Sequence, residues 1–381
     1  MQVVLVIAPA TLLTFAAVAL LPAHPTASVA VPVAATETTC LPHEPVESLD
    51  DINALVDTLR GNGEFMGADV GADVPLSDGR RLWVFGDTLR SPSFDGQRFV
   101  RNSMLVFDDS CATVVTPAGH GALIPDRADG VGYWPMSIAK IARDGYDLVG
   151  VTANRVRSGG DPGDSFAFSN LGPALAVFIV PTGRTPQLLT VQDIGADSDD
   201  LSRPAWGAAV AVTDKWVYLY GTAHPGKEGV FGYSLQVARV RPDDLLDVGA
   251  WRYWDGSDWV KDPTDAEELI SATGGVSQTL SVFEQDGRWY AVSKRDEFLG
   301  TQLVIWSAPS PTGPFVAGPP VASIRSDFAA GTLRYMPLAH PTLLPEEGTV
   351  IVSYSRNDTD LQKVEQDPFL YRPHFLRVPL P

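Results

Sequence analysis

One pattern recurs five times along the chain: a small-residue or apolar run, a tight polar turn, and a second apolar run that ends in polar residues. These hairpins cover residues 67–88, 134–152, 206–220, 276–293 and 339–354. A third alternating run follows each of them, at residues 103–107, 174–179, 235–240, 302–306 and 374–378. The runs are short, rich in β-branched and aromatic residues, and bounded by Gly, Pro, Asp and Ser, so they predict strands rather than helices. Five repeats built only from hairpins predict an all-β fold, the five-bladed β-propeller.

The propeller domain is expected to span residues 61–381 without a second domain. Divided among five repeats, this length leaves about 64 residues per blade, more than the roughly 40 to 45 of a minimal four-stranded blade. The surplus falls in loops, and the longest gaps between strands cover residues 153–173, 181–205 and 241–275. Because long loops on a rigid scaffold commonly carry binding sites, these loops are candidates for contact with a ligand.

The first residues bear on where the protein works. Residues 3–21 are almost wholly apolar and are followed by Ala-, Thr- and Pro-rich sequence with small-residue sites near 27–30 and 34–35. This pattern predicts a secretory signal peptide over residues 1–35, an N-terminal arm over residues 36–60, and a secreted protein. The usual basic n-region is missing, which leaves three alternatives: a signal peptide whose true start lies upstream, an uncleaved membrane anchor, and a misassigned start in a cytosolic protein.

Two cysteines are present, Cys40 in the arm and Cys111 after the third strand of the first blade. An even count in an exported protein suggests a disulfide. Such a bond would close a loop of about 70 residues, contribute roughly 4 kcal/mol in the chain-entropy model, and tie the arm to blade one. Two unrelated thiols are the alternative.

The net charge is −18, from 46 acidic and 28 basic residues. A surface of this sign repels nucleic acid and anionic lipid, and no local basic patch overrides it. The charge suits a soluble monomer with a neutral partner, and carbohydrate is the obvious neutral polymer. Membrane contact is expected only through an uncleaved N-terminal segment.

The candidate catalytic residues are Asp69, which opens the first strand of blade one, and Asp87, which closes the second. Both lie nine residues from Asp78 in the polar turn, so an antiparallel hairpin centred on that turn sets them opposite each other. Two carboxylates so placed cannot both ionise comfortably, and we expect one pKa to rise and the other to fall. Glycoside hydrolysis requires this division between a protonated acid and an ionised partner. Asp73, on the same strand face as Asp69, is the reserve candidate.

The same logic gathers the polar ends of the other hairpins on one rim, because every first strand begins there and every second strand ends there. The residues expected to bind substrate are Asp73, Asn102, Trp134, Arg203, Trp206, Gln278, Lys294, His340, Arg356 and Asn357. A ring of hydrogen-bonding groups with two tryptophan faces suits a sugar subsite better than a metal or phosphate site. Ordinary turn chemistry and packing between blades are the structural alternative for each of them.

Other chemistries lack the residues they need. The sequence has no Gly-x-Ser-x-Gly elbow, no nucleotide-binding glycine loop and no His/Cys cluster with zinc spacing. No cofactor is therefore expected. A calcium ion in the central channel needs only oxygen ligands and stays an open alternative.

Three segments of blade one resemble a known group of proteins. They are Gly-Ala-Asp-Val-Gly at 67–71, Asp-Gly-Arg-Arg-Leu-Trp-Val-Phe-Gly-Asp-Thr at 78–88, and Arg-Asn-Ser at 101–103. The chain is similar in these segments to the five-bladed actinobacterial propeller families known as domains of unknown function, one of which is endo-D-arabinanase. This resemblance implies that Asp69 and Asp87 are the catalytic pair.

More distantly, the chain is similar to the arabinanase, xylosidase and invertase propellers. The similarity lies in residues 307–315 and in His340, which resembles the last-blade histidine of those proteins. The relatives place a Glu general acid on blade three, where this chain has Ala-Trp-Gly at 205–207. The acid is therefore expected from blade one or from a loop, and the loop candidates are Asp129, Asp164, Asp200 and Asp296.

Two functions remain. The first is a secreted glycoside hydrolase that cleaves furanosidic linkages in a polysaccharide, such as the arabinan or arabinogalactan of an actinobacterial cell wall. The second is a catalytically silent propeller that binds cell-wall sugar or protein through the same rim. The acid pair on blade one is the feature that discriminates between them.

Overall fold

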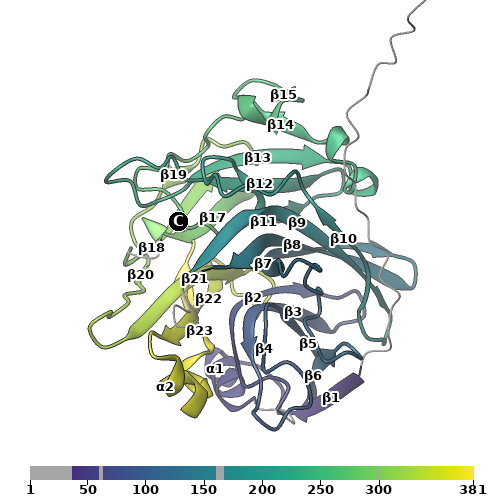
Figure 1. The fold of residues 1–381 in the computed structure, drawn as a ribbon. Coiled ribbons are helices and arrows are strands. Elements are labelled where there is room, and N and C mark those ends of the chain that lie inside the picture. Colours follow the sequence, from purple (N-terminus) through teal and green to yellow (C-terminus); the bar gives the residue numbers. More distant parts are fainter. Residues whose placement is uncertain (1–36, 60–62, 160–166, 298–299) are drawn as a thin grey trace, which may run out of the picture.

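The computed structural model describes residues 37–59, 63–159, 167–297 and 300–381. They form five antiparallel sheets, one for each of the five repeats (Figure 1). The first strand of each sheet lies beside the first strands of the two neighbouring sheets and so closes a ring. In order, these inner strands are β2 (Gly67–Pro75), β7 (Gly132–Arg143), β11 (Ala205–Val212), β16 (Ser281–Gln285) and β21 (Thr332–His340). This arrangement confirms the predicted five-bladed β-propeller.

Blades one and two follow the predicted order of strands. Blade one runs outward from β2 through β3 (Arg81–Leu89), β5 (Ser103–Phe107) and β6 (Cys111–Thr116) to β1 (Glu37–Pro42), with β4 (Phe99–Val100) also paired to β3. Blade two runs from β7 through β8 (Tyr146–Ser158) and β9 (Phe168–Pro181) to β10 (Gln187–Asp193). The third runs predicted at residues 103–107 and 174–179 lie in β5 and β9.

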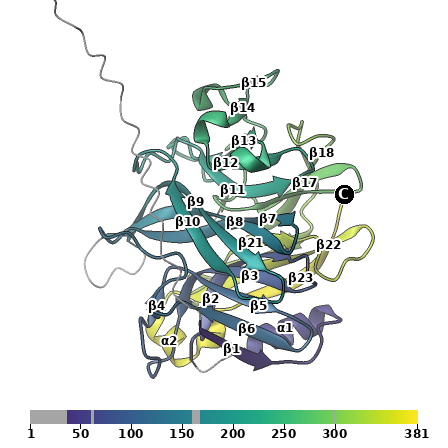
Figure 2. The same cartoon turned by 90° about the vertical axis from the view of Figure 1, so that its right-hand side faces the viewer.

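Blade three carries an additional hairpin that projects beyond the other blades (Figures 1 and 2). After β11 come β12 (Val217–Ala223), β13 (Ser234–Val240), β14 (Arg252–Trp254) and β15 (Trp259–Val260). Three single 3-10 turns accompany this hairpin: η1 (Pro242–Asp244), η2 (Val248–Ala250) and η3 (Pro263–Asp265). This insertion accounts for the long gap predicted between residues 241 and 275.

Blades four and five complete the ring. Blade four continues with β17 (Arg288–Lys294) and β18 (Gln302–Ala308), and both β19 (Val316–Ala317) and β20 (Ala322–Ser323) pair with β18. Blade five has only β22 (Thr349–Asp358) and β23 (Pro373–Pro379) after β21, with α2 (Leu361–Gln366) and the 3-10 turn η5 (Pro368–Leu370) between them. The described part of blade five is therefore a three-stranded sheet with β23 as its outer strand. The free backbone groups of this edge strand need partners from another segment of the chain.

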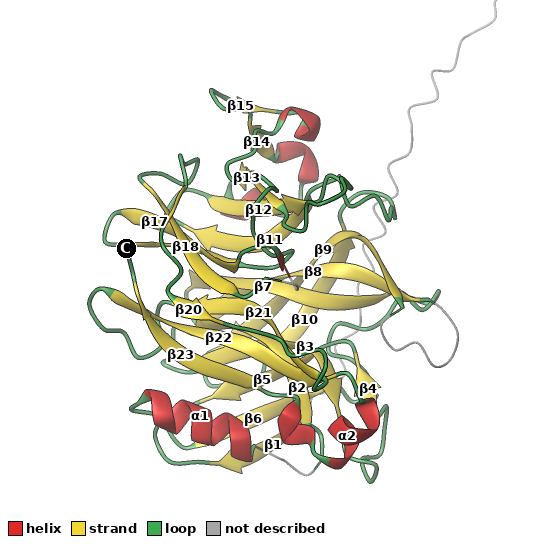
Figure 3. Cartoon of the chain, turned by 90° about the vertical axis from the view of Figure 1, so that its left-hand side faces the viewer, coloured by secondary structure: helices red, strands yellow, loops and turns green. Residues whose placement is uncertain are grey.

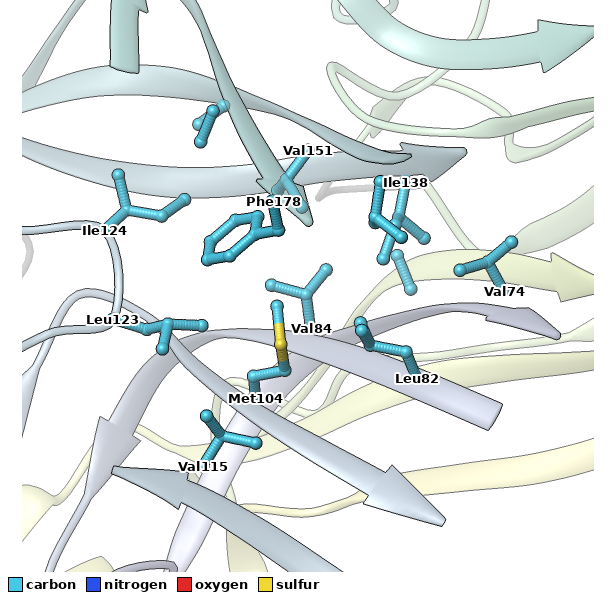
Figure 4. Close-up of a cluster of buried hydrophobic side chains, with 14 of the residues drawn as sticks. Val74, Leu82, Val84, Met104, Val115, Leu123, Ile124, Ile138, Val151 and Phe178 are labelled. Carbon is cyan, nitrogen blue, oxygen red and sulfur yellow. The ribbon is translucent and has the colours of Figure 1, made fainter. Parts of the chain in front are cut away.

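Apolar side chains fill the space between each pair of neighbouring blades. Between blades one and two, for example, Val84 and Met104 meet Val151 and Phe178, all fully buried (Figure 4). Four further clusters of the same kind occupy the other four gaps. A single blade would expose these faces to water, so burial between blades provides the main driving force for the ring.

The N-terminal arm covers the open edge of blade five. Ser48 caps the start of helix α1 (Leu49–Thr58), because its side chain accepts a hydrogen bond from the Asp51 amide. The helix buries Ile52 in the apolar cluster between blades five and one. The Asn53 side chain donates to the Phe375 carbonyl over 3.0 Å and accepts from the Phe375 amide over 2.9 Å. These two bonds satisfy the backbone amide and carbonyl of Phe375 at the edge of β23. Helix α1 lies beside this strand (Figure 3).

The arm is also fixed to blade one. Strand β1 pairs with β6, and Cys40 forms a disulfide with Cys111, which confirms the predicted bond. The predicted signal peptide, residues 1–35, lies outside the described residues. Among the residues that the structure describes, no helix is long and apolar enough to cross a membrane.

Candidate functional site

The first hairpin has the predicted centre. Pro75 pairs with Arg81 across the turn, and Ala68 pairs with Thr88 at the other end of the hairpin, so both pairs are centred on Asp78. Between Ala68 and Val70 the pairing shifts, and two residues of β3, Gly86 and Asp87, lie opposite Asp69 alone. The two carboxyl groups are thus neighbours in a hairpin with the predicted centre, at a β-bulge that sets Gly86 opposite Asp69 as well.

This bulge requires unusual backbone and side-chain geometry. Val70 has φ of +66°, which is rare for a β-branched residue and costs of the order of 1–3 kcal/mol. The carboxylate of Asp69 lies over Gly86, where an added Cβ atom would approach Oδ1 to less than 3.0 Å. Only glycine at position 86 leaves the space that the Asp69 carboxylate occupies.

Asp69 is buried and fully engaged in hydrogen bonds. Its Oδ2 atom accepts from the Tyr335 hydroxyl over 3.0 Å, and the carboxylate also accepts from the hydroxyl of Tyr371 and from the backbone amide of Asp87. Burial raises the pKa of Asp69 to about 6, although these three donors each lower it. The group is therefore mostly ionised at neutral pH and held in one orientation.

Asp87 lies closer to the solvent and has a higher pKa. The Trp134 indole Nε1 donates to its Oδ1 over 2.6 Å, and the guanidinium of Arg101 lies 3.7 Å from the same oxygen. Burial and the negative charge of Asp69 raise the pKa of Asp87 to about 8. The sequence-based expectation that one pKa would fall is wrong, because burial desolvates both carboxyl groups. The two pKa values are nevertheless separated, with Asp87 the protonated member near pH 7.

Four of the five inner strands break their pairing at the same height. The irregularities lie beside Asp69 in β2, Trp134 in β7, Trp206 in β11 and Tyr335 in β21. They occur at the end of the propeller where inner strands begin and second strands end, which we call the site rim. In Figure 2 this rim is the side on which β4 and α2 lie, opposite the C-terminus. In blades two, three and five the residue beside the irregularity is a tryptophan or a tyrosine, and in blade one it is Asp69.

Tyr335 and Tyr371 were missed by sequence reasoning. A usable signal existed, because Tyr335-Met336-Pro337 and Trp134-Pro135-Met136 each consist of a large aromatic residue followed by one methionine and one proline, in opposite order. The two segments take equivalent bulged positions in blades five and two. Tyr371, in contrast, lies after η5 and outside the strands, so no strand pattern pointed to it.

The family model described as a domain of unknown function (DUF5005) matches residues 55–379. The chain belongs to this family. No curated protein matches it. The family model thus covers the whole propeller, and the resemblance of this DUF5005 member to endo-D-arabinanase stays a prediction.

Solved structures are similar to this DUF5005 member at low identity. A Bacteroides ovatus protein provisionally described as a hydrolase has a TM-score of 0.58 and 17% identity, over 90% of this chain and 93% of that chain. The catalytic domain of a family-62 α-L-arabinofuranosidase from Coprinopsis cinerea has a TM-score of 0.46 and 11% identity, over 90% and 96%. A family-43 β-xylosidase/α-arabinofuranosidase from a compost microbial metagenome has a TM-score of 0.45 and 13% identity, over 88% and 94%. At this identity the first likeness indicates a shared fold.

Two of the predicted substrate-binding residues lie beside the acid pair. Trp134 bonds Asp87, and its ring packs edge-on against Phe168 with centroids 4.6 Å apart. Asn357 donates from Nδ2 to the Tyr335 hydroxyl over 3.3 Å and so lies behind Asp69. Arg101, which precedes the predicted Asn102, lies over the Trp134 ring at 5.7 Å. The site rim of the DUF5005 fold therefore combines two carboxyl groups with an indole and a guanidinium.

His340 is not on the site rim, which corrects the prediction. Strand β21 begins at Thr332 and ends at His340, whereas the sequence pattern was taken to start the hairpin at residue 339. His340 is buried at the turn end, where its Nδ1 and Asp73 Oδ1 lie 2.5 Å apart and its Nε2 bonds the Ser353 hydroxyl over 2.8 Å. Asp73 also pairs with Arg81, and these two partners lower its pKa. Both residues thus link blades one and five inside the protein.

Three other predicted residues are engaged in structural contacts. Asn102 is fully buried and bonds the backbone of Ile124 and Tyr133. Trp206 is buried against Tyr253, with ring centroids 4.9 Å apart. Arg356 pairs with Asp57 of α1 and donates to the Arg372 carbonyl. Their side chains hold blades, loops and the arm in place.

The remaining predicted residues lie on blades three and four, away from the acid pair. Lys294 is fully buried, donates to the Arg334 carbonyl over 2.8 Å, and has its pKa lowered to about 8 by burial. The Gln278 backbone amide donates to Glu297 Oε2 over 2.5 Å, and burial raises the pKa of Glu297 to about 7. Arg203 lies exposed on the loop before β11. Glu297, which follows the predicted Asp296 directly, was not identified from the sequence.

Two of the four loop candidates for the acid have a lowered pKa, which is the opposite of what a general acid requires. Arg127 holds the pKa of Asp129 well below its usual range, and the Ser202 hydroxyl lowers the pKa of Asp200. Asp296 lines a hollow described below, and Asp164 lies outside the described residues. Among the described residues, no group of three or more His, Cys, Asp or Glu side chains could hold a metal ion. Among the candidates that the structure describes, Asp87 is therefore the best placed to donate a proton.

Proposed function

We propose that this chain is a glycoside hydrolase in which Asp87 is the general acid and Asp69 is the ionised partner. The observation that carries the proposal is a buried carboxyl pair whose pKa values, about 6 for Asp69 and about 8 for Asp87, lie on either side of neutral pH. Two-carboxylate glycosidases need one protonated and one ionised group at the same time. Between these values the pair holds one proton, which resides on Asp87.

The roles follow from the neighbours of each carboxyl group. Asp87 is the more solvent-accessible of the two and lies against the Trp134 indole, so it can protonate the oxygen of a departing sugar at the rim. Asp69 is oriented by two tyrosine hydroxyls and one amide, as a base for water or a nucleophile requires. Trp134 and Phe168 add an apolar surface against which a sugar ring can pack.

We further propose that the substrate is a furanosidic polysaccharide of the arabinan or arabinogalactan type and that the protein is secreted. A net charge of −18 favours a neutral polymer over an anionic one. The disulfide between Cys40 and Cys111 supports an oxidising compartment, because such bonds are rare in the cytosol.

The test uses Asp69→Asn and Asp87→Asn with the unchanged protein as the reference. Each protein is incubated with D-arabinan, L-arabinan, arabinogalactan and xylan, and reducing ends are measured along with the melting temperature. We expect release of sugar from at least one polymer and a loss of at least a hundredfold in each variant, with folding retained. Equal release by all three proteins contradicts the site. Binding of a polymer without any release by the unchanged protein leaves a sugar-binding propeller instead.

A further inference from the structure

A second concave site lies on the site rim, at the boundary of blades three and four. This hollow has a volume of about 280 Å³ and is lined by Leu201 and His224 near β11 and β12, Phe231 and Tyr233 before β13, and Asp296 and Glu297 after β17. Strand β12 ends and β13 begins at the rim, as β3 and β4 do in blade one. The hollow and the acid pair therefore open on the same end of the propeller, two blades apart.

The walls of the hollow are aromatic. The ring of Phe231 is 53% exposed, and the rings of His224 and Tyr233 lie 5.2 Å apart. His224 has both ring nitrogens occupied, because Nδ1 accepts from the Gly226 amide over 3.1 Å and Nε2 donates to the Val230 carbonyl over 3.0 Å. The imidazole is thus held in place by two hydrogen bonds, and neither ring nitrogen is left to bind a metal ion.

The polar lining consists of carboxyl groups. Glu297 is anchored by the Gln278 amide, and its raised pKa makes it able to donate as well as to accept a hydrogen bond near neutral pH. Glu297 and its neighbour Asp296 have φ of +57° and +60°, so two successive residues are held in the left-handed region at this wall. Carboxyl groups repel an anionic ligand, which leaves a neutral, hydroxyl-bearing one as the best fit.

Exposed aromatic rings on the rim extend this surface. Among the described residues, four phenylalanines are strongly exposed: Phe99, Phe168, Phe231 and Phe328. Each lies next to a strand end at the site rim, in or beside β4, β9, β13 and β21. Soluble proteins rarely expose several large apolar side chains on one face unless that face binds something.

We propose that the hollow is a remote sugar subsite, which binds a unit of the same polysaccharide chain whose linkage lies at Asp69 and Asp87. The inference rests on the proposed function for the identity of the chain. Phe231 provides the face on which the sugar ring packs, and Glu297 bonds its hydroxyl groups. A chain long enough to reach from blade one to blade three gains affinity from this subsite, and a disaccharide does not.

Binding is measured first, in a protein that does not turn over its ligand. In the Asp69→Asn background, affinity for each polymer is compared with and without Phe231→Ala or Glu297→Gln. Val316→Ala is the control, because Val316 is 64% exposed on the outer strand β19 of blade four and pairs with Ser307 at the end of that blade opposite the site rim. We expect Phe231→Ala, which loses an aromatic contact with the sugar ring, and Glu297→Gln, which loses a carboxyl hydrogen bond, each to weaken polymer binding roughly tenfold, and the control to leave it unchanged.

Turnover is measured second, with Asp69 intact. Phe231→Ala should lower the ratio of kcat/KM for the polymer to kcat/KM for a disaccharide by roughly tenfold. An unchanged ratio, or no binding of any tested polymer by Asp69→Asn protein, overturns the subsite. The subsite is also overturned if the hollow binds an apolar dye or a detergent but does not bind polysaccharide. If the unchanged protein releases no sugar but its binding of a polymer depends on Phe231, the subsite is retained and the proposed hydrolysis is rejected. The two failures are therefore distinguishable.

Discussion

The hydroxyl of Tyr335 in blade five donates a hydrogen bond over 3.0 Å to Oδ2 of Asp69 in blade one. The two residues are 266 positions apart, and they meet because β21 lies beside β2 where the ring closes. The acid pair of a single hairpin thus depends on the last blade for its orientation. Its chemistry is expected to be sensitive to changes on both sides of this closure.

Replacing Tyr335 by phenylalanine removes this donor and keeps the ring. Because the hydroxyl lowers the pKa of Asp69, its loss should raise that pKa above about 6 and move the acid limb of the pH–rate profile upward. We also expect kcat to fall by roughly ten- to a hundredfold, since the carboxylate loses a fixed partner. The control is Tyr354→Phe, also in blade five, which does not contact Asp69. A reduced rate with an unmoved acid limb would show that Tyr335 only supports the fold.

Gly86→Ala should displace the Asp69 carboxylate. The new Cβ atom would overlap Oδ1, so either the side chain or the strand must move. We expect loss of most activity together with destabilisation of about 1–3 kcal/mol, measured by urea unfolding. Gly119→Ala serves as the comparison, because no heavy atom lies within 4 Å of its added Cβ. Full activity in Gly86→Ala protein would contradict the placement of Asp69.

Asp87→Asn should change how stability depends on pH. The pKa of Asp87 is raised from 3.8 to about 8 in the folded protein, so the folded state holds this proton where the unfolded state has released it. The contribution of Asp87 to stability is therefore full below about pH 4 and falls as the pH rises towards about 8. The asparagine variant lacks this loss, and at about pH 8 it should exceed the unchanged protein in stability by on the order of 5 kcal/mol, because a tenfold change in proton affinity corresponds to about 1.4 kcal/mol. Parallel stability curves of the two proteins from about pH 5 to about pH 8 would contradict the raised pKa.

Removing the disulfide tests the attachment of the arm. The bond between Cys40 and Cys111 spans 71 residues. Cys40→Ser together with Cys111→Ser should reduce the free energy of unfolding by roughly 4 kcal/mol, because the unfolded chain regains the freedom of that loop. Urea denaturation of the variant and of the oxidised protein measures the difference. A difference close to zero would mean that pairing of β1 with β6 holds the arm without the bond.

The repeat of hairpins was sufficient to predict the fold class and the number of blades. Strand patterns are local, since alternation, β-branched content and turn residues all lie within a few positions of each other. The proximity of Asp69 and Asp87 followed from the same source, because one hairpin and its turn at Asp78 determine both positions. The disulfide was predictable from the count and location of two cysteines.

The three-dimensional ring decided the rest. His340 pairs with Asp73, and Arg356 pairs with Asp57, across blade boundaries that no local pattern describes. A shift in where β21 begins moved His340 from the rim to the opposite end, since strand boundaries are set by bulges and neighbouring sheets as well as by residue type. Burial raises the pKa values of both acids, and Tyr335 and Tyr371, which come from distant segments of the chain, lower that of Asp69 by their hydrogen bonds. Sequence alone determined which carboxyl groups meet, and tertiary packing decided how much water and which donors surround them.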